Sequence, residues 1–325
     1  MIDNIVEDYT KKMKSKSIVD RQLGTIVYLI DHHAFRVGNE KGADEADTVG
    51  VSTLKVSHLS PEGENNMIFN FLGKDSVQFF STLKLDATAY KNLVDFRKGK
   101  KPGDQVFDKV GSKEINDYLK TFMSALTAKV FRTFRASSKY YEQLKGTKST
   151  LTLDQKIKKE KDANRAVAVL CNHTRKVTAK AELALTNKKA ELKELKKTLK
   201  SLSGKKLDAA KIKVAKMEAL IEEKSSNRDK ACTTSKTGYI DPRIAVAWSY
   251  KFDVPLNKIY SATLIKKFNW AIQTVDKKWD YFKSPINLIV EKSEKKSSSK
   301  AVRTRETKSS KTTRASKTTK PKVDI

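Results

Sequence analysis

The sequence predicts a mainly α-helical protein with a small antiparallel β element and an antiparallel coiled-coil hairpin. Three observations support this fold class: apolar residues recur at helical spacing, two short apolar segments flank a glycine-containing turn, and two heptad seams follow one another. We expect a globular core over residues 1–175, a coiled-coil linker over 176–231, a C-terminal domain over 232–283 and a disordered basic tail over 284–325.

In the globular core, an apolar run over residues 27–30, continued by Ala34, Phe35 and Val37, predicts a buried helix that ends at Gly38. Strand character follows over residues 51–59, 67–71 and 77–80.

The turn at residues 72–76 contains Gly73 and Asp75, which favours a hairpin between the last two strands. Residues 115–126 and 162–171 have the patterns of helices.

Heptad spacing marks residues 176–230. The first seam consists of Leu185, Leu192, Leu195, Leu199 and Leu202, and the second of Leu207, Ala210, Val214, Met217 and Ile221. The small polar break at residues 203–205 predicts a turn, so the two helices should pair antiparallel. This region holds 15 Lys and 1 Arg against 8 acidic residues. The charge fits a solvated helical surface and a DNA contact equally well.

Residues 244–252 and 264–275 predict two amphipathic helices in a segment that contains all three tryptophans. Past residue 290 the composition changes sharply. Residues 291–325 carry 12 basic and 4 acidic side chains among serine and threonine, too few apolar groups to form a core. We expect this tail to be disordered.

A formal net charge of +29 favours a polyanionic partner. Nucleic acid is the leading candidate, because phosphate neutralisation by Lys and Arg releases counterions. An anionic membrane surface is the main competitor. No hydrophobic run approaches the roughly 20 residues of a membrane span, and the N-terminus lacks a secretory pattern, which predicts an intracellular protein.

The only cysteines, Cys171 and Cys232, form no CxxC pair or Cys/His cluster, so they support neither zinc binding nor a disulfide framework. There is no P-loop motif for a nucleotide. The sequence therefore predicts no cofactor and no metal, and it leaves open phosphate chemistry that depends on cationic side chains. Taken singly, the candidates Arg36, Lys74, Arg132, His173 and Tyr239 each have ordinary structural explanations.

Six segments change this assessment when they are read together. They occupy residues 36–41, 46–50, 71–76, 126–133, 164–173 and 234–243. In sequence and in order they resemble the eukaryotic type IB DNA topoisomerases, and they bracket a coiled-coil linker where that family has one. The resemblance extends over residues 5–282. It implies the helical catalytic fold shared by tyrosine recombinases and type IB topoisomerases.

The resemblance also implies residue roles. Arg36 and Arg132 would hold the non-bridging oxygens of the scissile phosphate, and His173 would hydrogen-bond the same group. Lys74 would protonate the leaving 5′ oxygen, and Tyr239 would attack to form a 3′-phosphotyrosyl link. The expected DNA contacts are Arg36, Lys41, Thr48, Lys74, Thr127, Lys129 and His173. The resemblance further implies an isomerase that relaxes DNA supercoils without ATP or metal. It also implies that the protein is monomeric and acts in the nucleus.

Two departures from the family are visible. Gly238 stands where the family usually has Asn, which affects local hydrogen bonding and sensitivity to camptothecin-type poisons. The N-terminal cap lobes have no counterpart, so the resemblance is compatible with a fragment, a subunit whose lobes come from a separate chain, or a minimal enzyme.

Two other interpretations stay open. A tyrosine recombinase would use a similar set of side chains, but it would lack the long coiled coil, and the His-x-x-Arg spacing is absent after His173. The other is a catalytically weak or silent DNA-binding or architectural protein, such as a decayed topoisomerase fragment; the retained set of five candidate residues argues against it.

Overall fold

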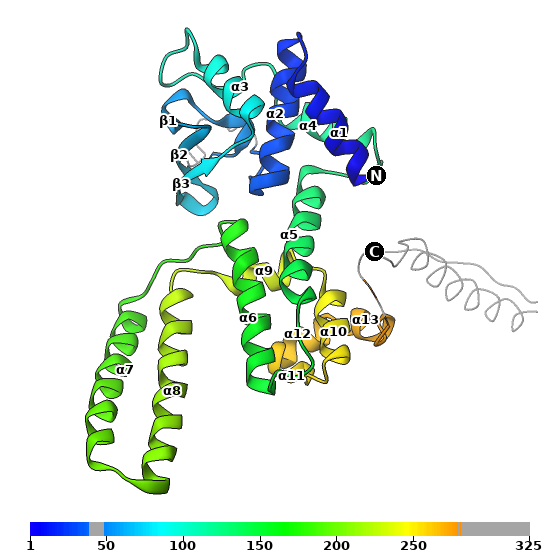
Figure 1. Cartoon of the computed structure of the whole chain (residues 1–325). Coiled ribbons are helices and arrows are strands. Elements are labelled where there is room, and N and C mark those ends of the chain that lie inside the picture. The colour runs from blue at the N-terminus through cyan, green and yellow to red at the C-terminus, as the bar shows by residue number, and fades with distance from the viewer. Residues whose placement is uncertain (39–48, 279, 281–325) are drawn as a thin grey trace, which may run out of the picture. The chain divides into compact units, whose positions relative to one another are not determined.

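The computed structural model describes residues 1–38, 49–278 and 280 of the chain (Figure 1). The first helices are α1 (Ile2–Met13), α2 (Ile18–His33), α3 (Ala87–Arg97), α4 (Ser112–Lys120), α5 (Ala128–Lys145) and α6 (Leu153–Leu170). They are followed by α7 (Ala179–Thr198), α8 (Gly204–Ser226), α9 (Cys232–Gly238), α10 (Pro242–Lys251), α11 (Leu256–Ile259), α12 (Ala262–Lys267) and α13 (Asn269–Thr274). The strands are β1 (Leu59–Gly63), β2 (Asn66–Gly73) and β3 (Val77–Lys84). The predicted mainly α fold with a small antiparallel β element is confirmed.

Helices α1 and α2 pack against each other along apolar faces. Ile5, Tyr9 and Met13 are buried at four-residue spacing on α1. Gly24 on α2 permits the close approach, because a Cβ at this position would lie 2.6 Å from the Tyr9 carbonyl oxygen. Ser17 caps the N-terminus of α2 by accepting a hydrogen bond from the Asp20 N–H.

Helix α2 ends at His33, five residues before the predicted end at Gly38. Ala34 adopts the left-handed conformation (φ 50°, ψ 36°), which stops the helix. The Phe35 N–H then bonds to the Leu29 carbonyl. Residues 34–38 consequently leave the helix as a loop and carry Arg36 away from the helix axis.

The sheet is a three-stranded antiparallel meander in the order β1-β2-β3. The predicted hairpin between β2 and β3 is confirmed, with Gly73 paired to Val77 and a single 3₁₀ turn at Lys74–Ser76. Phe35 packs its ring against Phe69 and Phe79, at centroid distances of 5.0 and 5.1 Å. The loop that carries Arg36 is thus anchored to the sheet.

The predicted strand over residues 51–59 is wrong. Residues Val51–Thr53 and Val56–His58 form 3₁₀ turns, and β1 begins only at Leu59. The N–H groups of Val51 and Ser52 bond to the carbonyls of Arg36 and Val37 rather than to a neighbouring strand. This segment therefore holds the Arg36 loop instead of extending the sheet.

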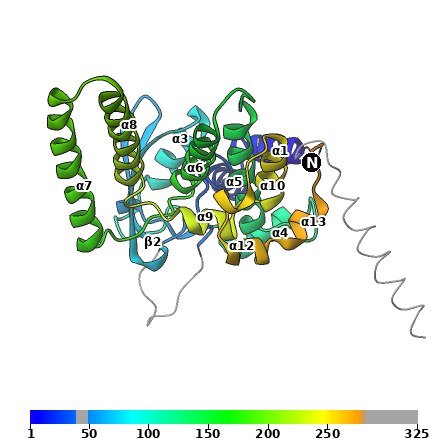
Figure 2. The same cartoon turned by 90° about the horizontal axis from the view of Figure 1, so that it is seen from below.

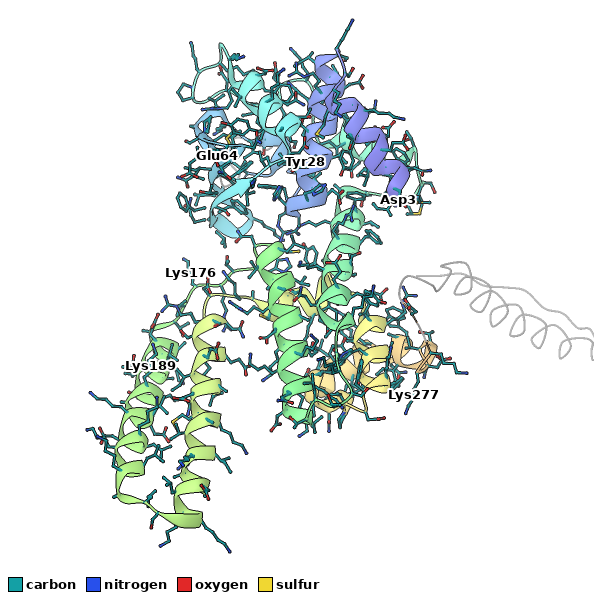
Figure 3. The ribbon with its side chains drawn as sticks, in the orientation of Figure 1. Asp3, Tyr28, Glu64, Lys176, Lys189 and Lys277 are labelled. Carbon is teal, nitrogen blue, oxygen red and sulfur yellow. The ribbon has the colours of Figure 1, made fainter. Side chains whose placement is uncertain are left out.

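The predicted hairpin of heptad helices is confirmed in α7 and α8, which lie side by side in both views (Figures 1 and 2). All ten residues of the two predicted seams are buried or half-buried. An ion pair joins the helices at Lys196–Glu218 (2.5 Å), and Arg228, two residues after the end of α8, pairs with Glu182 of α7 (3.0 Å). Lysine side chains such as Lys189 project from the outer surface (Figure 3).

Two helix predictions need correction at their ends. The helix predicted over residues 115–126 is α4, which ends at Lys120. The helix predicted over 264–275 is split into α12 and α13 at Phe268, whose ring is buried against Tyr260. The helices predicted over 162–171 and 244–252 correspond to α6 and α10.

The four-segment division stays a prediction, and the tail predicted over residues 284–325 lies outside the described residues. None of the described helices combines the length and the apolar character that a membrane crossing needs.

Candidate active site

Arg36 reaches the ring of a tyrosine that lies 203 residues further along the chain. Its Nη1 donates a hydrogen bond of 2.8 Å to the Tyr239 Oη, and its guanidinium carbon lies 5.9 Å from the centre of the same ring. A cation that donates a hydrogen bond to a phenolic oxygen stabilises negative charge there.

Arg132 lies on α5, with only 3% of its surface exposed. Its Nε donates to the Ala34 carbonyl, and its Nη2 donates to the Cys171 carbonyl at 2.7 Å. These bonds fix the guanidinium with its carbon 4.7 Å from the centre of the Tyr239 ring. Burial lowers the pKa of Arg132, although an arginine remains charged at neutral pH.

His173 follows the C-terminus of α6. Asn172 takes the left-handed conformation (φ 48°), and the His173 N–H bonds back to the Ala168 carbonyl. The imidazole is buried, with its centroid 4.6 Å from that of Tyr239. Burial, helped by the charges of Arg132 and Arg36, lowers the pKa of His173 to about 3. The ring is therefore neutral at physiological pH.

Tyr239 is the residue directly after α9 and is half-buried. Its N–H donates to the Ser235 carbonyl at 3.0 Å, and its carbonyl accepts a bond from the Ser137 hydroxyl at 3.3 Å. The chain returning from α8 brings α9 to this place, because the Ala231 N–H bonds to the His173 carbonyl at 2.7 Å. Both ends of the coiled-coil hairpin thus meet beside the candidate site.

Lys74 lies at the β2–β3 turn and is exposed. It lines one open pocket together with Arg36, Arg132 and His173. Arg132 Nη1 and His173 Nε2 in this pocket are buried and have no hydrogen-bond partner among the described residues. Arg132 Nη1 is an unpaired cationic donor, and His173 Nε2 is a second donor when the neutral ring carries its hydrogen there; an anionic ligand would satisfy both.

The remaining predicted DNA contacts are placed only in part. Thr127 caps α5 by accepting a hydrogen bond from the Val130 N–H, and Lys129 is exposed in the first turn of the same helix. Lys41 and Thr48 lie outside the described residues. In the described ranges, no group of three His, Cys, Asp or Glu side chains is arranged to hold a metal ion.

Two serines at the site were not identified from the sequence. Ser235 is fully buried, with its Oγ 2.8 Å from His173 Nδ1. Ser137 receives the Asp241 N–H at 2.9 Å and so holds the chain just after Tyr239. Ser235 lies inside one of the six segments that carry the resemblance, so the sequence placed it close to Tyr239 along the chain. Its contact with His173, 62 positions away, could not be predicted from the sequence pattern.

Acid should destabilise the fold through His173. The unfolded imidazole takes up a proton near pH 6.5, whereas the folded one resists protonation down to about 3. The contribution of the neutral His173 to the free energy of unfolding is therefore fully present above pH 6.5. As the pH falls below 6.5 toward 3, this contribution decreases by about 1.4 kcal/mol per pH unit. Urea unfolding of the wild-type protein and of a His173→Gln variant between pH 7 and 5 measures the effect. The variant should show the flatter dependence, and parallel curves would contradict the assignment.

Comparison with known proteins shows what the chain resembles. A family model described as the catalytic core of eukaryotic DNA topoisomerase I matches residues 1–206, and one described as the C-terminal topoisomerase domain matches residues 211–281. DNA topoisomerase 1 of Caenorhabditis elegans is 42% identical over 299 residues, covering 83% of this chain and 37% of the relative. DNA topoisomerase 1 of Homo sapiens is 37% identical over 315 residues, covering 86% of this chain and 41% of the relative.

The fold is mainly helical, and it brings two arginines and a histidine around the ring of one tyrosine. The chain belongs to the eukaryotic DNA topoisomerase I family. It spans well under half the length of these two relatives, 37% and 41% respectively.

Gly238 should tolerate the asparagine that the resemblance leads one to expect there. A Cβ at this position would meet no atom within 4 Å, whereas one at Gly24 would lie 2.6 Å from a backbone oxygen. Gly238→Asn should stabilise the fold by about 0.3–0.5 kcal/mol, since Asn costs less than Gly in a helix. Gly24→Asn should destabilise it by about 2 kcal/mol or more. Chemical denaturation of both variants tests the pair, and a large loss of stability at position 238 would refute the prediction.

Proposed function

We propose that this chain cleaves and rejoins one strand of duplex DNA as a type IB DNA topoisomerase. The observation that carries the proposal is the convergence of Arg36, Arg132 and His173 on Tyr239. Membership of the topoisomerase I family and the net charge of +29 support DNA as the partner.

In the proposed reaction the Tyr239 Oη attacks phosphorus, an Oη–P bond forms, and the bond from phosphorus to the 5′ oxygen breaks. The phenolic proton passes to solvent water, and the Arg36 hydrogen bond favours that loss. The phosphodiester energy is kept in the 3′-phosphotyrosyl bond. The free 5′ hydroxyl can therefore reverse the reaction after the strand has rotated, without ATP or metal.

The two guanidiniums and the imidazole have separate tasks in this proposal. Arg132 Nη1 and His173 Nε2 are the free polar atoms that would bind non-bridging phosphate oxygens. Ser235 would donate its hydroxyl hydrogen to His173 Nδ1, so that the neutral ring carries its hydrogen at Nε2. Lys41, Thr48, Thr127 and Lys129 would contribute contacts to the DNA backbone or groove.

Lys74 is proposed as the acid that protonates the departing 5′ oxygen. Lys74→Ala should slow cleavage about 10²-fold on ordinary DNA, but far less on a substrate with sulfur at the 5′ bridging position, because a thiolate leaves without a proton. Single-turnover cleavage of both substrates gives the comparison. Lys84→Ala, an exposed lysine at the end of β3, is the control. Equal slowing on both substrates would argue against an acid at position 74.

The test of the function is relaxation of supercoiled plasmid by this polypeptide alone, with EDTA and without ATP. A topoisomerase relaxes any supercoiled plasmid, a recombinase requires defined sites, and a silent DNA-binding protein only retards the DNA in a gel. Retardation without relaxation would overturn the proposal. A monomeric state and nuclear localisation belong to the same proposal, and gel filtration and imaging of a fluorescent fusion would test them.

A further inference from the structure

Helix α9 is short, and its placement determines the position of Tyr239, which follows it directly. A seven-residue helix has little stability of its own and depends on tertiary contacts for its orientation. On one side, Ser235 anchors it to His173. The next residue, Lys236, bonds instead to Glu160 and to the Ile259 carbonyl, and it does not line the candidate pocket.

Lys236 is held by an ion pair with little solvent access. Its Nζ lies 2.9 Å from Oε1 and 3.1 Å from Oε2 of Glu160, and it donates a third bond of 2.7 Å to the Ile259 carbonyl. Only 15% of the Lys236 side chain and 1% of the Glu160 side chain are exposed. The Lys236 ammonium also lies 5.6 Å from the centre of the Tyr260 ring.

Glu160 receives a second donor from another helix. The Tyr140 hydroxyl donates a hydrogen bond of 2.7 Å to Glu160 Oε1. Burial, together with the Glu160 charge, raises the pKa of Tyr140 well above its ordinary value, so the phenol keeps its hydrogen and remains a donor. The carboxylate of Glu160 is thus bound from two sides.

This network joins the three helices that lead to the candidate catalytic groups. Tyr140 lies on α5, which carries Arg132, and Glu160 lies on α6, which leads to His173. Lys236 lies on α9, which leads to Tyr239. The three helices lie close together in both ribbon views (Figures 1 and 2). A buried ion pair adds little net stability compared with apolar packing, so directional positioning is the better physical account of it.

We propose that the network of Lys236, Glu160 and Tyr140 is a positioning device that sets the distance and orientation of Tyr239 relative to Arg132 and His173. The inference rests on the proposed function for its activity readout. Lys236 is a positioning residue rather than a catalytic one, because its hydrogen bonds go to Glu160 and Ile259.

The test compares Lys236→Met and Glu160→Gln with Lys161→Met. Lys161 follows Glu160 directly on α6, and its Nζ lies 2.9 Å from a carboxylate oxygen of Glu223 on α8. It therefore provides a lysine in an ion pair outside the network. Single-turnover cleavage at saturating DNA should fall about 10- to 100-fold in Lys236→Met, because an error of about 1 Å in the nucleophile is enough for such a loss. DNA affinity should stay within about twofold, since no phosphate contact is removed. Lys161→Met should cleave like the wild type.

Rescue separates positioning from general stability. Lys236→Arg keeps the charge and the donors, and it should recover most of the cleavage rate. All rates are measured well below the melting temperature of each variant. If Lys236→Met does not fold, Glu160→Gln takes its place in the comparison, because glutamine keeps hydrogen-bonding capacity at that position. Wild-type cleavage by Lys236→Met, or equal slowing by Lys161→Met, would overturn the inference.

A second readout does not need activity. With 3-fluorotyrosine incorporated, the ¹⁹F resonance of residue 239 should be single in the wild type and broadened or shifted in Lys236→Met, but unchanged in Lys161→Met. If the wild type forms no DNA adduct, the proposed function fails while this spectrum still decides the positioning role. An identical spectrum in Lys236→Met would count against it.

Discussion

Replacing Tyr239 with phenylalanine should abolish covalent attachment to DNA while leaving DNA binding intact. The change removes only the Oη, which accepts the Arg36 hydrogen bond, and leaves the ring in contact with Arg132 and His173. The fold should therefore persist. Cleavage should drop by about 10⁴-fold or more, because no neighbouring group can replace the oxygen that forms the bond to phosphorus.

The measurement is a denaturing gel of labelled duplex after incubation with the protein, beside a gel-shift titration for affinity. Tyr250→Phe is the control, because Tyr250 is a half-buried tyrosine on α10, a helix that carries none of the proposed catalytic residues. It should form the adduct at the wild-type rate. An adduct that survives denaturation in Tyr239→Phe would show that another side chain attacks the DNA.

Features with a local cause could be predicted from the sequence. The heptad leucines of α7 and α8 are buried because spacing along one helix decides which face meets the other. The β2–β3 hairpin follows from Gly73 and the flanking apolar residues. The predicted strand over residues 51–59 failed because its N–H groups bond to the Arg36 loop, a tertiary contact with no trace in the apolar pattern.

The position of the candidate site depends on left-handed residues that the pattern does not reveal. Ala34 ends α2 and turns the chain toward Arg36, and Asn172 ends α6 and turns it toward His173. Alanine has no intrinsic preference for this conformation, so the predicted helix ran on to Gly38. The resemblance supplied the residues of the site, but the contacts of Ser235 and Lys236 come only from the folded chain.

Arg132→Lys should be the most damaging conservative substitution in the cationic part of the site. A lysine keeps the charge but cannot donate to the carbonyls of Ala34 and Cys171 while also offering a free donor to a phosphate. The free energy of unfolding should fall by about 2–4 kcal/mol, because two buried carbonyls lose their partner. Cleavage at saturating DNA should fall about 10²- to 10³-fold, the usual loss when a fixed donor to a developing charge is removed.

Arg135→Lys distinguishes these two losses. Arg135 lies one turn further along α5, where its guanidinium binds both carboxylate oxygens of the buried Asp31, and it does not line the pocket. This variant should lose comparable stability while keeping cleavage within about tenfold of the wild type at a temperature where it is folded. Urea denaturation and single-turnover cleavage of the two variants give the comparison. If both variants lost cleavage in proportion to stability, Arg132 would be a structural residue, and the phosphate would have to be held by Arg36 and His173 alone.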